Sequence, residues 1–138
     1  MEPKLFVATK AFISYQGKIL ILRESKKYHD GSNQGKYDVV GGRIKPGQNF
    51  KDSLLREIKE ETGLDVVIGK PFFVNEWRPV VDNKPWQIVG IFFNCEAKSQ
   101  QITLSQDHDD YLWVDPKDYK DYNIIENLSP VFEAYLNQ

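Results

Sequence analysis

Between Gly42 and Leu64 the chain reads GRIKPGQNFKDSLLREIKEETGL. The glycines of its first part favour a loop, and its second part predicts a helix. Glu57, Glu60 and Glu61 recur at helical spacing, which places their carboxylates on one helix face. Like charges so placed repel each other, whereas a hard divalent cation with oxygen ligands removes the conflict. The segment therefore indicates a Mg²⁺ or Mn²⁺ site beside a loop that can admit phosphate.

A second interpretation of the acidic run is a solvated helix face, in which Arg56 and Lys59 partly neutralise the glutamates. The surrounding pattern favours the metal site. Residues 42–64 closely resemble the signature of the Nudix hydrolase family, G-x5-E-x7-R-E-U-x-E-E-x-G-U, where U is aliphatic. One fixed position differs, because Gln48 stands where the family has glutamate. The matching residues are Gly42, Arg56, Glu57, Ile58, Glu60, Glu61, Gly63 and Leu64.

Length and element order predict one α+β domain spanning residues 1–138. A chain of 138 residues with 41% hydrophobic and 28% charged residues can bury a core and has the composition of an ordinary globular domain. Strands are expected before and after the helix, which predicts a mixed sheet between helices. Resemblance to the Nudix family implies the same α/β/α sandwich, with the Nudix box at residues 42–64.

Hydrophobic patterns and turn residues place the strands. Residues 5–15 and 18–23 are expected to form a hairpin around Gln16-Gly17, and residues 25–35 read as a polar loop. Further strands are expected at residues 37–40, 64–68, 72–77, 86–97 and 111–114, with a closing helix at residues 127–136.

The central helix is expected over Asn49–Thr62. Asn49 or Gln48 can cap its start, and Gly63 is placed to stop it. Leu54, Leu55 and Ile58 are expected on its buried side, which leaves the glutamates on an adjoining face.

The resemblance also implies a chemistry. Nudix enzymes hydrolyse a nucleoside diphosphate linked to another moiety, in a reaction where water attacks phosphorus and a phosphoanhydride bond breaks. Both the substrate and the leaving group are strongly anionic, and divalent cations offset that charge. The chain is therefore expected to be a Mg²⁺-dependent pyrophosphohydrolase, with Mn²⁺ as an alternative ion. Its small size favours a nucleoside triphosphate or another compact nucleotide, as for MutT-like members.

Family positions assign roles to individual residues. Glu57 and Glu61 are expected to bind the metal directly, with Glu60 close behind. A backbone carbonyl of Gly41 or Gly42 is a further expected ligand, since glycine lets the backbone approach an ion closely. The expected catalytic residues, which bind or activate the attacking water, are Glu57, Glu60 and Asp107. Asp107 stands where many family members have a glutamate, and its competing interpretation is a solvated turn rich in acidic residues.

Two residues of the box are expected to be structural. In the family the arginine at the position of Arg56 pairs with the first glutamate of the box, so its partner here would be Gln48. The glutamine oxygen can still accept a hydrogen bond, without the charge assistance of a carboxylate. A weaker loop anchor is expected rather than an inactive site.

Three residues outside the box are candidates for substrate binding. Trp77 and Trp86 flank the Asp82-Asn83 turn and can line one cleft, where a base could stack on an aromatic face. Asn127 precedes the closing helix, near where some members that remove oxidised nucleotides place a base-reading asparagine. For each tryptophan the competing interpretation is an ordinary core or strand-face residue.

Composition limits the remaining possibilities. A net charge of −2 with no basic block argues against nucleic-acid binding, and no apolar run reaches membrane-spanning length. A single cysteine, Cys95, lies in an apolar run and suits a core position in a cytoplasmic protein. A homodimer is an open expectation, because family members are often dimers. The alternative function is a catalytically silent Nudix domain that binds a nucleotide as a sensor or regulator.

Overall fold

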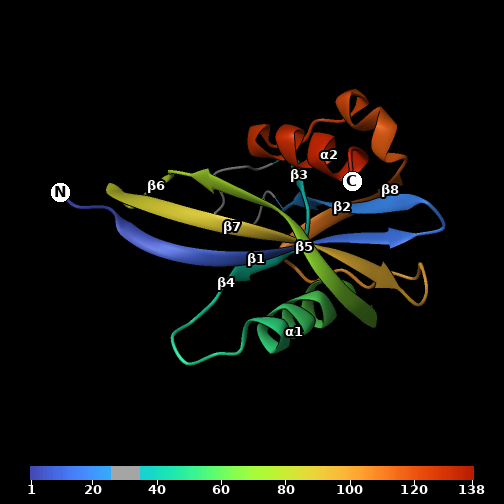
Figure 1. Ribbon diagram of the computed structural model, residues 1–138, viewed down its shortest axis with the longest axis horizontal. Helices are drawn as coiled ribbons and strands as arrows, with labels where there is room; N and C mark the ends of the chain where they lie inside the picture. The colour runs from blue at the N-terminus through green and yellow to red at the C-terminus, as the bar shows by residue number, and fades with distance from the viewer. Residues whose placement is uncertain (26–34) are drawn as a thin grey trace.

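The computed structural model describes residues 1–25 and 35–138. In these residues an eight-stranded sheet lies between α1 (Phe50–Thr62) on one face and α2 (Ser129–Leu136) on the other (Figure 1). The expected α/β/α sandwich is therefore confirmed. Most of the expected loop at residues 25–35 lies outside the described residues.

The centre of the sheet is a parallel pair, β1 (Lys4–Tyr15) and β7 (Lys84–Ala97). The other pairs are antiparallel, including β1 with β2 (Lys18–Glu24) across the expected hairpin turn, so the sheet is mixed. Its main order is β3-β2-β1-β7-β5, with β4 pairing β1, β6 pairing β7 and β8 pairing β2. The remaining strands are β3 (Tyr37–Asp38), β4 (Gly41–Arg43), β5 (Val66–Trp77), β6 (Val80–Val81) and β8 (His108–Val114).

The structure corrects two strand predictions. The segments expected at residues 64–68 and 72–77 form one strand, β5, whose register against β7 shifts on both sides of Pro71. Proline cannot donate to the ladder, and here the pairing absorbs that loss in an irregularity instead of ending. The strand expected at residues 37–40 ends at Asp38, and Gly41 and Gly42 belong to a separate strand, β4, where they pair with Lys10 and Thr9 of β1.

Alternation along β1 divides the core between the two faces of the sheet. Ala11 and Ile13 pack with α1, whereas Phe12 packs with Phe132 of α2. All four side chains are fully buried, as expected for a central strand covered on both sides. Its central, buried position makes β1 a rigid support for the strands that pair with it, β4 and β7.

Local signals fix α1. Asn49 caps the helix by accepting from the backbone N–H groups of Lys51 and Asp52, and Gly63 ends it in the left-handed region at φ 76°. Leu54 and Ile58 are fully buried as expected. The prediction for Leu55 is wrong, because it is 41% exposed and lies outside the face that packs on the sheet.

The C-terminal part covers the other face of the sheet. Two 3₁₀ helices, η1 (Pro116–Asp121) and η2 (Glu126–Leu128), lead into α2, so the helix expected from residue 127 begins as a 3₁₀ turn. Cys95 is buried in the core, as expected. Among the helices of the described residues, none has both the length and the apolar character needed to cross a membrane.

Candidate active site

A cavity of about 520 Å³ opens between the β4–α1 loop, the inner side of α1 and the start of β8. Glu57, Glu61 and Asp107 are all among the residues that line it. They come from two segments far apart in sequence, which the pairing of β8 with β2 brings together. The cavity also contains Gly41 and Gly42, so most of the residues expected at the metal site share one space.

Glu57 is held against the backbone of β4. A Cβ built on Gly42 would lie 3.3 Å from the Glu57 carboxyl carbon, so the glycine leaves room for this carboxylate. Burial raises the pKa of Glu57 above its ordinary value; Arg56 lowers it, Glu60 and Glu61 raise it further, and Lys10 lowers it. The carboxylate therefore occupies a place where negative charge is incompletely compensated.

The pKa of Glu61 is shifted in the opposite direction, because two side chains donate hydrogen bonds to its carboxylate. Its Oε2 accepts a hydrogen bond from Ser105 Oγ at 2.6 Å and lies 2.8 Å from His108 Nδ1. A carboxylate only accepts hydrogen bonds, so in this pair Nδ1 carries the proton. Burial acts to raise the pKa of Glu61, but the hydrogen bonds from His108 and Ser105 outweigh it and lower the pKa. The role of His108 as a partner of Glu61 was missed in the sequence, because 47 residues separate the two.

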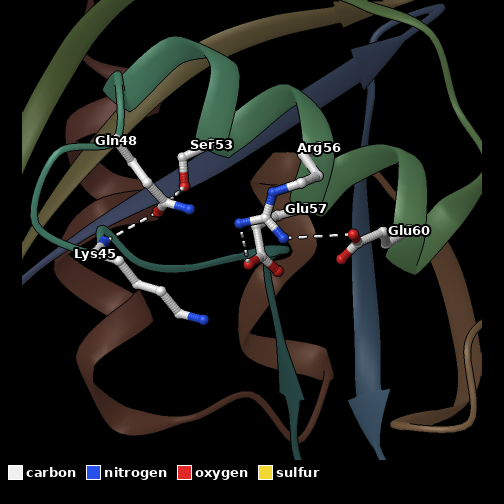
Figure 2. Close-up of polar contacts among 6 residues, drawn as sticks. All are labelled: Lys45, Gln48, Ser53, Arg56, Glu57 and Glu60. Carbon is white, nitrogen blue, oxygen red and sulfur yellow. Dashed lines mark hydrogen bonds and ion pairs between the residues drawn. The ribbon is translucent and has the colours of Figure 1, made fainter.

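Glu60, unlike Glu57 and Glu61, is not among the residues that line the cavity. Its side chain is 55% exposed, and its Oε1 lies 3.4 Å from Arg56 Nη1 (Figure 2). Arg56 also approaches Glu57, at 3.7 Å from Nη2 to Oε1. The helix spacing thus brings Glu57 and Glu61 together and leaves Glu60 on the outer side.

The expected contact between Gln48 and Arg56 is absent from the described residues. Gln48 Oε1 instead accepts from the backbone N–H of Lys45 at 3.0 Å and from Ser53 Oγ at 3.4 Å (Figure 2). The neutral amide is a sufficient acceptor for these donors, whereas the glutamates that follow Arg56 on the helix attract its guanidinium. The loop is therefore anchored to the first turn of α1 without the arginine.

Part of this arrangement fits a divalent cation. Within the described ranges, no three His, Cys, Asp or Glu side chains already lie close enough together to enclose an ion. Glu57 and Glu61 nevertheless line one cavity beside the backbone of Gly41 and Gly42. Two carboxylates and a carbonyl suit Mg²⁺, which keeps several waters and takes further oxygens from a phosphate.

A second cavity of about 560 Å³ contains the three residues expected to bind substrate. Trp77 and Trp86 line it together, as expected for one cleft, and Asn127, the middle residue of η2, also lines it. The Asn127 backbone carbonyl accepts from Asn75 Nδ2 at 2.8 Å. Its side-chain Oδ1 is buried and has no hydrogen-bond partner among residues 1–25 and 35–138. A buried acceptor left without a donor is costly unless a ligand or water supplies one.

An arginine secures Trp86 at the rim of this cavity. The Arg43 Cζ lies 4.6 Å from the centre of a Trp86 ring and 4.5 Å from that of Phe6. A guanidinium over aromatic rings is favourable in both contacts. The three side chains come from β1, β4 and β7, so the wall of the cavity is tied to the central strands.

The two cavities meet at Lys10 and Asp38, which line both of them. Lys10 Nζ donates to Asp38 Oδ2 at 3.0 Å, and the lysine side chain is only 11% exposed. Neither residue was singled out from the sequence. The available signal was a charged residue in the otherwise uncharged run VATKAFI at the start of the sheet.

Comparisons with known proteins identify the family and the fold. A family model described as the NUDIX domain matches residues 5–135. The chain is 28% identical over 100 residues to the nucleoside triphosphatase NudI of Escherichia fergusonii, covering 65% of this chain and 69% of that protein. The structure of a MutT protein from Methanosarcina mazei Go1 superposes with a TM-score of 0.87 at 24% identity, covering 99% and 96% of the two chains. An Ap4A hydrolase of C. elegans gives a TM-score of 0.68 at 14% identity, covering 97% and 96%, and shows a shared fold alone.

Proposed function

This chain belongs to the Nudix hydrolase family and is an enzyme acting on phosphoanhydrides, and from that premise we propose that it hydrolyses a nucleoside triphosphate or similar small nucleotide with Mg²⁺. One observation carries the proposal. An acidic cavity adjoins a cavity lined by two tryptophans, and Lys10 and Asp38 line both. A ligand that joins a polyphosphate to a flat aromatic base matches that pair of spaces.

The acidic cavity would receive the phosphates. Glu57, Glu61 and a backbone carbonyl of Gly41 or Gly42 would hold Mg²⁺, with Mn²⁺ as an alternative. When bound, the ion offsets phosphate charge and polarises the phosphoryl oxygens. Hydrogen bonds from Ser105 and His108 keep Glu61 ionised and fixed in orientation.

We assign Asp107 as the general base that accepts the proton of the attacking water. Asp107 lines the same cavity as Glu57 and Glu61, and no hydrogen bond to its carboxylate is found among the described residues. The water oxygen forms a bond to phosphorus, the water proton passes to Asp107, and the anhydride P–O bond breaks with its electron pair leaving on the departing phosphate. Glu60, which was also expected to be catalytic, would act through its ion pair with Arg56, beside Glu57.

The tryptophan cavity would receive the nucleoside. Stacking on Trp77 or Trp86 recognises the flat face of a base, and Asn127 Oδ1 offers an acceptor for a base or sugar donor. The similarity to a nucleoside triphosphatase supports a substrate of this size. We further propose that the protein acts in the cytoplasm on free nucleotides and not on nucleic acid. A homodimer stays a prediction.

The test is a screen for phosphate release with Mg²⁺ and added inorganic pyrophosphatase. It compares nucleoside triphosphates, oxidised nucleoside triphosphates, ADP-ribose and dinucleotide polyphosphates. The Glu57→Gln, Glu61→Gln double variant should lose turnover, whereas Glu96→Gln, which changes an exposed glutamate of β7, should retain it. Nucleotide binding by the wild-type protein without turnover of any substrate would instead support the silent, regulatory alternative.

A further inference from the structure

Lys10 stands at the junction of the two cavities. It lies in β1, opposite Gly41 of β4, and its backbone is part of the central sheet. Asp38 is the other residue that lines both spaces. A group at this point faces the place where a nucleoside in one cavity would connect to phosphates in the other.

The lysine side chain is held firmly in this position. A Cβ built on Gly41 would lie 3.0 Å from Lys10 Cδ, so the lysine stem passes directly over that glycine. At its end, Nζ donates to Asp38 Oδ2 at 3.0 Å. Asp38 is fixed in turn, because its Oδ1 accepts from the Val39 backbone N–H at 2.7 Å. A short chain of contacts therefore determines where the ammonium lies.

The ammonium is not fully used within the protein. An ammonium has three N–H groups, and in the described part of the chain Lys10 donates only to Asp38. A buried ion pair contributes little to stability compared with well-packed apolar residues, since desolvation offsets the attraction. A nearly buried cation with unused donors that faces two cavities is better explained by an anionic ligand than by packing.

We propose that Lys10 is a substrate-binding residue whose Nζ donates to the phosphate next to the nucleoside, and that Asp38 is a positioning residue that aims it. This inference rests on the proposed function and adds a direction to it. The nucleoside occupies the tryptophan cavity, the first phosphate lies at Lys10, and the phosphate chain continues toward Glu57 and Glu61. Because of Lys10, the protein should bind a nucleoside monophosphate more tightly than the same nucleoside without its phosphate.

The test measures binding without turnover. Titrations followed by two-dimensional NMR, with EDTA present, would compare each common deoxynucleoside monophosphate with its deoxynucleoside. The informative pair is Asp38→Asn against the Lys10→Met, Asp38→Asn double variant, because with a neutral amide at position 38 the loss of the lysine leaves no unpaired buried carboxylate. Lys51→Met, on the outer side of α1, is the control.

We expect the double variant to bind the monophosphates about ten- to hundredfold more weakly than Asp38→Asn, the range for a hydrogen bond to a charged group. Binding of the deoxynucleosides should change less than about twofold. Equal losses for both ligands, or equal monophosphate affinities in the two variants, would overturn the role of Lys10. So would a wild-type protein that binds no monophosphate better than its nucleoside.

Asp38 is tested by its own pair of variants. Asp38→Ala removes the acceptor that aims Lys10, whereas Asp38→Asn keeps an oxygen there. Monophosphate binding should therefore fall in the first and recover in the second, and a merely structural role would give equal affinities in both once folding is verified by thermal melts. Because these titrations need no catalysis, an inactive wild-type enzyme would refute the proposed function without deciding the role of Lys10.

Discussion

His108 Nδ1 lies 2.8 Å from Glu61 Oε2, so the last glutamate of the acidic helix face is already engaged by the protein. Ser105 Oγ contacts the same oxygen at 2.6 Å. Ser105 lies just before β8 and His108 is the first residue of that strand, so two neighbouring positions engage the same carboxylate oxygen. The other oxygen, Oε1, makes no hydrogen bond within residues 1–25 and 35–138 and is the one that we propose for the cation.

These contacts predict a specific loss of stability in acid. The pKa of Glu61 is lowered from its ordinary value of 4.5, although burial acts to raise it. A carboxyl of this kind stabilises the fold above its unfolded pKa, and that contribution is lost as the pH falls through the lower folded value. Urea unfolding of wild-type protein and Glu61→Gln should therefore give midpoints whose difference shrinks as the pH is lowered below about 4.5. A difference that stays constant with pH would contradict this.

Glu57 predicts the opposite behaviour. Burial raises the pKa of Glu57 above its ordinary value of 4.5, so the charged form is disfavoured in the fold. The stability of the wild-type protein therefore declines as the pH rises from the unfolded pKa to the higher folded pKa. In EDTA at pH 7, Glu57→Gln should be more resistant to urea than wild type, while its turnover with Mg²⁺ falls. A less stable Glu57→Gln protein would mean that Arg56 and Lys10 fully compensate the charge.

Metal binding should reverse that penalty. At a Mg²⁺ concentration ten times the dissociation constant, the wild-type fold gains about 1.4 kcal/mol. For a domain of this size that is a rise of roughly 3–5 °C in the melting temperature. Differential scanning calorimetry should detect the rise in wild type but not in the Glu57→Gln, Glu61→Gln double variant. Equal rises in both proteins would place the ion elsewhere.

Gly41 and Gly42 should respond very differently to a methyl group. At Gly41, with φ 153°, a Cβ would lie 2.1 Å from the Thr9 carbonyl oxygen, so Gly41→Ala should destabilise the protein by about 3 kcal/mol or more. At Gly42 the neighbour is the movable Glu57 carboxylate, so Gly42→Ala should retain most stability and lower turnover by up to about a hundredfold. Chemical denaturation measures the stability of each variant, and steady-state rates measure its turnover. Similar stability of Gly41→Ala and Gly42→Ala would contradict this prediction.

Gln48 provides a test of the loop anchor. Gln48→Ala removes the acceptor for the Lys45 backbone N–H and Ser53 Oγ, so it should lower stability by about 1 kcal/mol. Gln48→Glu keeps both contacts and should remain active, because Arg56 is engaged with Glu57 and Glu60. An activity gain above about tenfold in Gln48→Glu would show that the arginine contact typical of the family matters here after all.

Signals that lie close together in sequence predicted their structures well. The caps of α1 at Asn49 and Gly63 and the turn between β1 and β2 depend on a few adjacent residues. The shared position of Glu57 and Glu61 on one side of α1 was predicted for the same reason, since it depends on helical spacing alone. The interrupted Nudix pattern then supplied the sandwich, which no local rule would have specified.

Contacts between distant segments could not be predicted in this way. His108 is 47 residues from Glu61, and Asp38 is 28 residues from Lys10, so only the sheet pairing brings each pair together. Leu55 was misassigned because a helix face can be located from sequence only to within about one residue. The break predicted between residues 68 and 72 was wrong, because pairing with β7 carries β5 through Pro71 with a shift of register.

The buried position of Cys95 has a practical consequence for chemical labelling. Burial raises the pKa of this thiol to about 12, so the reactive thiolate is scarce at neutral pH and the side chain has no access to solvent reagents. The native fold should therefore resist maleimides, and a cysteine placed on its surface would be the one site that reacts. Fluorophores or spin labels could then be attached at chosen points around either cavity without first removing the natural thiol.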